Sequence, residues 1–185
     1  MIPTLGLDLS KSSAGWALWD GKSDKARFGH RRLGNGVLTN HGLTFARVHE
    51  LMNELHMICP YEAVFVEKPL DPQLMSKIQN FDTPFLLYGL AAHAHSYCEA
   101  KGIRKLQMVH QATWRKHFIG SMRIGTKKPV LKQLTMERCA QFGMPVRTDD
   151  EADAIGILDY GIEMQGITAP WRRDNILLPP LKALP

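Results

Sequence analysis

The chain has 185 residues, a net charge of +5 and a composition of 44% hydrophobic, 22% charged and 8% aromatic residues. This composition is typical of a globular protein with a sizeable core, and it excludes disordered, collagen-like and disulfide-stapled classes. The longest apolar stretch, residues 85–94, is too short to span a bilayer, and no leader pattern opens the chain. Three scattered cysteines (Cys59, Cys98 and Cys139) favour neither a disulfide framework nor a zinc knuckle. We therefore expect a single-domain protein of the reducing cytoplasm, with no membrane partner.

Charge is distributed unevenly along the chain. Residues 101–148 contain eleven Lys or Arg and a single acid, Glu137, so this segment carries +10 and the remainder carries −5. A solvated basic face is the simpler interpretation, but so large an excess favours a polyanionic partner, most commonly nucleic acid. Trp114 and Phe118 lie within this segment, where they either stack on bases or pack inside the fold.

Three strands are predicted at the N-terminus. Residues 4–10 alternate, so that the leucines point one way and Asp8 points the other, which is typical of a strand with one buried face. Residues 14–20 follow after a short polar link and are the expected hairpin partner. Residues 25–33 form a third expected strand before the turn signal Gly-Asn-Gly.

Helices and strands alternate further along the chain. The predicted elements are a helix at 43–58, a strand at 63–67, a helix at 73–101, a strand at 105–110, and helices at 112–118 and 130–142. A final helix begins with a capping box, in which Thr148 is the N-cap and Glu151 the third helical residue. The order predicts an α/β fold with a mixed five-stranded sheet flanked by helices. We expect one domain over residues 1–166, followed by an extended, Pro-rich tail at 167–185.

Four carboxylates are unusual because of their positions. Asp8 lies inside the first strand, Glu67 ends an apolar strand, and Asp150 and Asp153 lie on one face of the last helix. Each has a structural alternative, such as capping a turn for Asp8, an ion pair with Lys68 for Glu67, or the helix dipole for Asp150. Together they indicate a divalent-cation site, because unpaired buried carboxylates are costly and hard oxygen ligands suit Mg²⁺ or Mn²⁺.

Other catalytic motifs are missing from the sequence. It contains no Walker A, GxGxxG, GxSxG, HExxH or CxxC pattern. A nucleotide cofactor and serine-hydrolase chemistry therefore have no local support.

The motifs that carry the four acids resemble those of one nuclease family. They are Gly6-Leu-Asp-Leu-Ser10 with Gly15-Trp-Ala17, then Val64-Phe-Val-Glu67, then Asp150-Glu-Ala-Asp-Ala154. The set resembles the RuvC-type Holliday-junction resolvases of the RNase H-like superfamily, over about residues 4–163, and the small, tail-bearing form is similar to the phage or prophage branch. Actin-like kinases share the first motif, but they need about twice this length.

The resemblance implies the chemistry and the partners. Asp8, Glu67, Asp150 and Asp153 match four catalytic acids that bind two Mg²⁺ ions, for which Mn²⁺ can substitute. Such a site hydrolyses a phosphodiester of a four-way DNA junction without a covalent intermediate and leaves 5′-phosphate ends. Paired nicks imply a homodimer, for which residues 85–92 are the expected contact. The alternative for these residues is a role in the core alone. The expected DNA-binding residues are Arg115, Lys116, Arg123, Lys127, Lys128 and Lys132.

The sequence departs from the family at one position. The better-known members carry an aromatic residue after the strand-four glutamate, whereas Lys68-Pro-Leu70 stand here, and Phe81 is the candidate substitute. Two alternatives stay open: a related nuclease that acts on RNA, flaps or forks, and a non-catalytic nucleic-acid-binding module with the same fold.

Overall fold

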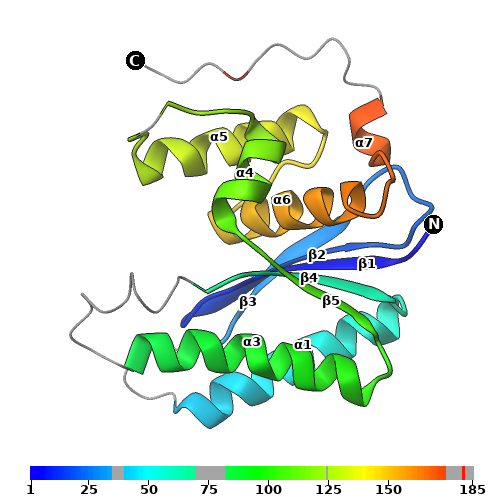
Figure 1. The fold of residues 1–185 in the computed structure, drawn as a ribbon, viewed down its shortest axis with the longest axis vertical. Coiled ribbons are helices and arrows are strands. Elements are labelled where there is room, and N and C mark those ends of the chain that lie inside the picture. Colours follow the sequence, from blue (N-terminus) through cyan, green and yellow to red (C-terminus); the bar gives the residue numbers. More distant parts are fainter. Residues whose placement is uncertain (35–39, 70–81, 124, 174–180, 182–185) are drawn as a thin grey trace.

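The protein folds around a mixed sheet with helices on both faces (Figure 1). The structure, a computed structural model, describes residues 1–34, 40–69, 82–123, 125–173 and 181. Its elements are β1 (Thr4–Leu9), β2 (Ser13–Trp19), β3 (Arg27–Arg32), α1 (His41–Ile58), β4 (Ala63–Glu67), α3 (Asp82–Ala100), β5 (Lys105–Val109), α4 (Gln111–Ile119), α5 (Lys128–Gln141), α6 (Asp149–Glu163) and α7 (Pro170–Arg173). The strand order is β3-β2-β1-β4-β5, antiparallel from β3 to β1 and parallel from β1 to β5. The predicted fold class is therefore confirmed.

The predicted boundaries of the helices and strands agree with the observed ones to within a few residues, except where residues 70–81 are not described. The helix expected at 73–101 is present as α3 from Asp82, and residues 70–81, which include the candidate aromatic Phe81, lie outside the described residues. None of the helices in the described ranges is long and apolar enough to cross a bilayer.

Strand alternation decides which side chains face which helices. Leu5 and Leu7 of β1 are fully buried against the layer formed by α1 and α3. Asp8 therefore points to the opposite face, where α6 packs. In β4, Phe65 belongs to the core beneath α6, so Glu67, two residues later, faces the same side. Both strand acids thus lie on the α6 face of the sheet.

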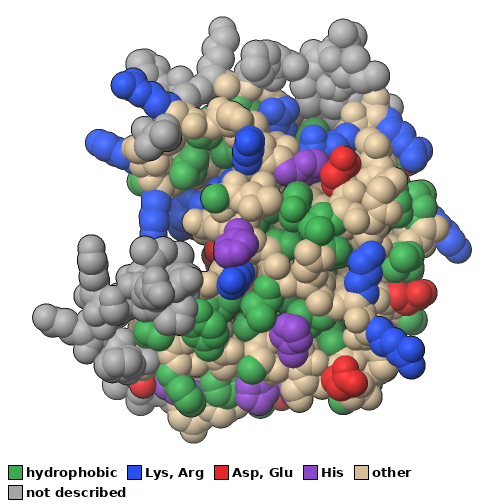
Figure 2. All heavy atoms as spheres, viewed as in Figure 1, with side chains coloured by type: hydrophobic (Ala, Val, Ile, Leu, Met, Phe, Trp, Pro, Cys, Tyr) green, Lys and Arg blue, Asp and Glu red, His purple; other side chains and the backbone are tan. Residues whose placement is uncertain are grey.

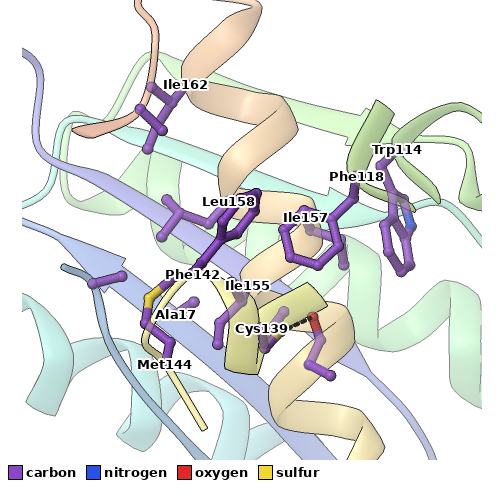
Figure 3. Close-up of a cluster of buried hydrophobic side chains, with 14 of the residues drawn as sticks. Ala17, Trp114, Phe118, Cys139, Phe142, Met144, Ile155, Ile157, Leu158 and Ile162 are labelled. Carbon is purple, nitrogen blue, oxygen red and sulfur yellow. Dashed lines mark hydrogen bonds between the residues drawn. The ribbon is translucent and has the colours of Figure 1, made fainter. Parts of the chain in front are cut away.

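Helix α6 lies between the sheet and a second helical layer made of α4 and α5 (Figures 1 and 3). Trp114 and Phe118 of α4 pack against it, as do Cys139 and Phe142 from α5 and the turn after it. Trp114 and Phe118 are 0% and 1% exposed, so these aromatics pack inside the fold and do not stack on bases.

The start of α6 confirms the predicted cap. The Thr148 hydroxyl accepts a hydrogen bond from the Glu151 amide at 3.2 Å. In a capping box the Glu151 carboxylate would accept a hydrogen bond from the Thr148 amide. It accepts instead from the Arg147 amide at 2.8 Å, and it contacts His30 at 2.9 Å. The first turn of α6 is thereby tied to the edge strand β3.

The first residues of the predicted tail differ from the expected extended chain. Residues 170–173 form α7, and Trp171 is 1% exposed. The Trp171 indole donates to the buried carboxylate of Asp159 at 2.8 Å, and the Arg172 guanidinium binds both oxygens of the same carboxylate. A charged anchor in α6 therefore holds this segment on the domain, which the Pro-rich composition gives no reason to expect.

Candidate active site

The sheet and α6 bring the four predicted acids to one edge of the fold. The parallel register pairs Leu7 with Val66, so Asp8 and Glu67, the next residues of β1 and β4, are neighbours. Asp150 and Asp153 lie in the first turns of α6, which packs across β1 and β2. A cavity of about 280 Å³ opens at this point, and its walls include Asp8, Glu67, Gln111 and Lys128.

Gly15 allows α6 to approach the sheet closely enough to form this site. It is the register partner of Asp8 across the β1–β2 hairpin. A Cβ atom at this position would overlap the backbone carbonyl of Asp150. The glycine in the first motif is therefore required for close packing, which places Asp150 beside Asp8.

Burial raises the pKa values of Asp8, Glu67 and Asp153. Burial, and then the charges of Glu67, Asp153 and Asp150, raise the pKa of Asp8 well above its usual range, and the charge of Arg115 opposes this rise. Burial raises the pKa of Asp153 to about 7, although its pairing with Arg115 lowers it. Burial also raises the pKa of Glu67, against hydrogen bonds that stabilise its charged form. Burial therefore disfavours the charged forms of these three acids when no further cation is present.

Two of the acids, Asp150 and Glu67, accept hydrogen bonds from uncharged side chains. The Ser13 hydroxyl donates to Asp150. Gln111 and Trp114 donate to the two oxygens of Glu67 at 2.8 and 2.9 Å. Ser13 and Gln111 were not predicted from the sequence. Ser13 is the first residue of β2, and Gln111 is the first residue of α4. A polar side chain at the start of an element next to an acid is the signal that could have identified them.

Arg115 provides the positive charge inside the site. One guanidinium nitrogen donates to Asp153 Oδ2 at 2.5 Å, and both side chains are nearly buried, at 10% and 8% exposed. The guanidinium also lies over the Trp114 ring, 4.9 Å from its centroid. Gln111, Trp114 and Arg115 share one face of α4, so this helix positions two of the four acids.

Trp114 in turn depends on a glycine of α6. A Cβ atom at Gly156 would lie 2.6 Å from the Trp114 ring, so only glycine allows the indole to settle against the helix. From that position the indole nitrogen reaches Glu67. Packing and polar contacts are therefore coupled at this site.

The acids have the chemistry to hold a divalent metal ion, although their side chains do not already enclose one. Their ligand atoms are carboxylate oxygens, and burial raises three of the pKa values, with neighbouring acids adding to the rise for Asp8 and Asp153. The buried Asp153 Oδ1 has no hydrogen-bond partner among the residues that the structure describes. Within the described ranges, no three His, Cys, Asp or Glu side chains converge on a single ion position. The protein donors explain this, because Glu67, Asp150 and Asp153 are turned toward Trp114, Ser13 and Arg115 respectively.

The predicted DNA-binding residues separate into two groups. Five are exposed: Lys116, Arg123, Lys127, Lys128 and Lys132. Lys128 lines the cavity that contains Asp8 and Glu67, and Lys132 pairs with Asp149. Arg115 is instead buried and paired with Asp153. Figure 2 shows Lys and Arg side chains around α4 and α5.

The basic segment does not form one continuous surface. Lys101, Arg104 and Lys105 lie around the start of β5, where they line a separate cavity together with Ile2. The acids lie at the other end of the same parallel strands. Only the α4–α5 part of the segment is therefore near the acids.

The fold is similar to that of RuvC, as predicted. It is similar to the structure of Thermus thermophilus RuvC in complex with a Holliday junction substrate, with a TM-score of 0.66 and 14% identity over 90% of this chain and 97% of that one. A second structure of Thermus thermophilus RuvC gives a TM-score of 0.64 and 14% identity, over 91% and 99% of the two chains. The yeast mitochondrial Holliday junction resolvase Ydc2 gives 0.56 and 15%, over 91% and 80%.

At 14–15% sequence identity, these structural similarities establish the fold alone and not the activity or the substrate. No protein-family model and no curated protein matches the sequence. The similarity to a phage or prophage branch stays a prediction.

Proposed function

We propose that this protein is a divalent-metal-dependent endonuclease that resolves four-way DNA junctions. The observation that carries the proposal is the meeting of Asp8, Glu67, Asp150 and Asp153 at one sheet edge, beside an exposed basic surface on α4 and α5. Acids in such number next to a phosphate-binding surface are unfavourable unless cations join them. This argues against a binding module without catalysis.

The four acids would hold two Mg²⁺ ions, with Mn²⁺ able to substitute. Such ions would supply activation of water for attack on phosphorus and stabilisation of the leaving 3′ oxygen, and the products would carry 5′-phosphates. Ser13, Gln111 and Trp114 orient the carboxylates. Arg115 pairs with Asp153, and its guanidinium would be free for a phosphate oxygen if Asp153 bound a metal ion instead.

Two nicks placed symmetrically require two active sites, and a homodimer is the simplest arrangement. Helix α3 supports this proposal, because Phe85 and Tyr88 are 63% and 36% exposed on its outer face while Leu86 and Leu90 pack inward. We expect a dimer in light scattering, and a shift to monomer in Phe85→Glu. A monomeric wild-type chain would contradict it.

The three cysteines are free thiols, which supports the cytoplasm as the place of action.

The decisive experiment is cleavage of a labelled four-way junction, beside matched duplex, flap, fork, single-strand and RNA substrates, with Mg²⁺ and with EDTA. We expect paired, Mg²⁺-dependent nicks in the junction, and a loss of at least about 1,000-fold in Asp8→Asn with binding retained. Preferential cleavage of a flap, a fork or RNA would show a different substrate from the one proposed, with the same metal-dependent hydrolysis. Tight junction binding without any cut would favour the binding module.

A further inference from the structure

We propose that a cavity between α4 and α5 binds one unstacked nucleobase of the strand that is cut. This inference rests on the proposed function and assigns a second subsite to it. The cavity has a volume of about 450 Å³, within the range of roughly 300–1,000 Å³ found for small-molecule pockets. The residues that line it include Gln111, Ala112, Arg115, Ile119, Met122 and Leu131.

The cavity shares a wall with the acid site. Gln111 lines both cavities, and its amide donates to Glu67 at 2.8 Å. Arg115 lines the α4–α5 cavity, and its guanidinium donates to Asp153 at 2.5 Å. A strand whose phosphate reaches the acids therefore passes the mouth of this cavity, and an adjacent base is the first group able to enter.

The lining matches a base better than a phosphate. Ile119, Met122 and Leu131 provide apolar walls, which suit the two faces of a heterocycle, and the methionine sulfur is polarizable. Gln111 and Ser121 provide hydrogen-bonding groups for a base edge.

The rim of the cavity provides positive charge. Lys116 is exposed at this rim, where its ammonium suits the phosphate that carries the base. Figure 2 shows apolar side chains exposed among Lys and Arg side chains in the region of α4 and α5. Apolar walls inside a basic surface are what a nucleotide requires, whereas a phosphate ion alone would need only the charges.

A branched substrate makes such a base available. Nucleotides beside a branch point have already lost part of their stacking and pairing, so turning one out of the stack costs less there than inside a duplex. Proteins that read unstacked bases hold them between side-chain faces and bind their edges. The cavity would thus favour certain bases beside the cut, and would do so without the aromatic residue that this sequence lacks after Glu67.

The test fills the cavity from its exposed side. Ala112 is exposed and lines this cavity, and it does not line the acid cavity. Ala112→Trp should therefore block the cavity, with Ala112→Leu as a milder variant. The matched control is Thr113→Trp, an exposed neighbour on α4 that does not line the cavity. The cut positions are first mapped with the wild-type protein, and 2-aminopurine is then placed at the nucleotides that flank them. Its fluorescence is measured on binding to the Asp8→Asn form of each variant.

We expect binding to raise the fluorescence by about threefold at one flanking position in the parent protein and in the Thr113→Trp control. Ala112→Trp should abolish this rise while changing junction affinity by less than about threefold, because the phosphate contacts remain. Ala112→Leu should reduce it partially, and both cavity variants should lose preference among bases at the cut. Identical behaviour of Ala112→Trp and Thr113→Trp would overturn the subsite and leave the nuclease intact. Failure of the wild-type protein to bind or nick branched DNA would overturn both.

Discussion

The two faces of the sheet are packed in different ways. The face covered by α1 and α3 is closed by apolar side chains such as Leu5, Leu7 and Val66. The face beneath α6 buries charge as well: every buried charged residue in the described ranges lies on that side. These residues are Arg115, Glu151, Asp153 and Asp159. Burial of apolar side chains on the first face therefore stabilises the fold. Holding buried charges close together on the second face lowers the free energy of unfolding.

The buried charges differ in how well they are compensated. Asp159 accepts hydrogen bonds from Trp171 and Arg172 and contacts His117 at 2.9 Å. Although burial alone would raise its pKa, these partners hold it below the usual value. Among the described residues, Asp153 forms an ion pair with Arg115 alone, and burial raises its pKa. Full compensation marks a structural anchor, whereas partial compensation marks a site prepared for a ligand.

The difference between the apolar face and the charge-bearing face of the sheet can be tested most directly at two adjacent residues of β1. Leu7→Ala removes a fully buried side chain from the apolar face, and should lower the free energy of unfolding by about 2–5 kcal/mol. Asp8→Asn removes one of four crowded carboxylates, and should leave the metal-free protein equally stable or raise its stability by about 1 kcal/mol. Urea denaturation in EDTA measures both. Strong destabilisation by Asp8→Asn would show that the acids stabilise the fold.

Arg115→Gln tests whether the acid site relies on an internal cation. Removal leaves Asp153 buried without its partner, so the metal-free protein should lose up to about 3 kcal/mol. Saturating Mg²⁺ should restore most of this loss and should raise the melting temperature of the variant more than that of the wild type. Lys116→Gln, an exposed neighbour, is the control, and should change stability by less than about 0.5 kcal/mol. An equal response of both variants to Mg²⁺ would separate Arg115 from the metal site.

The fold was predictable because strand alternation and helix caps are local features. The alternation in residues 4–10 placed Asp8 opposite the leucines, and Thr148 marked the start of the last helix. The positions of the acids on those elements then followed, because parallel strands end at the same edge of a sheet. The sequence pattern therefore predicts which elements carry the candidate acids and at which end of the parallel strands they meet.

The partners of the acids were not predictable, because they depend on packing between distant elements. A basic segment gives no sign that Arg115 is buried while Lys116, next to it, is exposed. Nothing local links Ser13 to Asp150, since the contact depends on the absence of a side chain at Gly15. The anchoring of α7 by Asp159 likewise joins a helix to a Pro-rich segment that composition describes as tail.

The pH dependence of stability follows from the raised pKa values. Carboxylates in the unfolded chain lose their protons near pH 4, whereas burial keeps Asp153 protonated up to about pH 7. Between these values the folded state binds more protons. The stability of the metal-free protein should therefore fall by up to about 4 kcal/mol as pH rises from about 4 to 7, and then level off. Asp159 acts in the opposite direction, because its lowered pKa gives stability that is lost only as pH falls below about 4. Denaturation of wild type and Asp153→Asn at several pH values measures this, and Asp153→Asn should show a flatter profile. An equally steep profile in that variant would assign the dependence to other groups.

The smallest expected effect distinguishes the two ends of the sheet within one basic segment. Lys127 is exposed at the start of α5, beside Lys128 of the acid cavity, whereas Lys101 is exposed near the start of β5 at the far end of the strands. Each phosphate contact contributes about 0.9 to the slope of log affinity against log salt concentration. Lys127→Ala should therefore reduce that slope by about one and weaken binding severalfold at low salt, while Lys101→Ala should change neither. Equal losses in the two variants would mean that DNA also crosses the far end of the sheet, and that the charge segregation in the sequence describes one continuous surface.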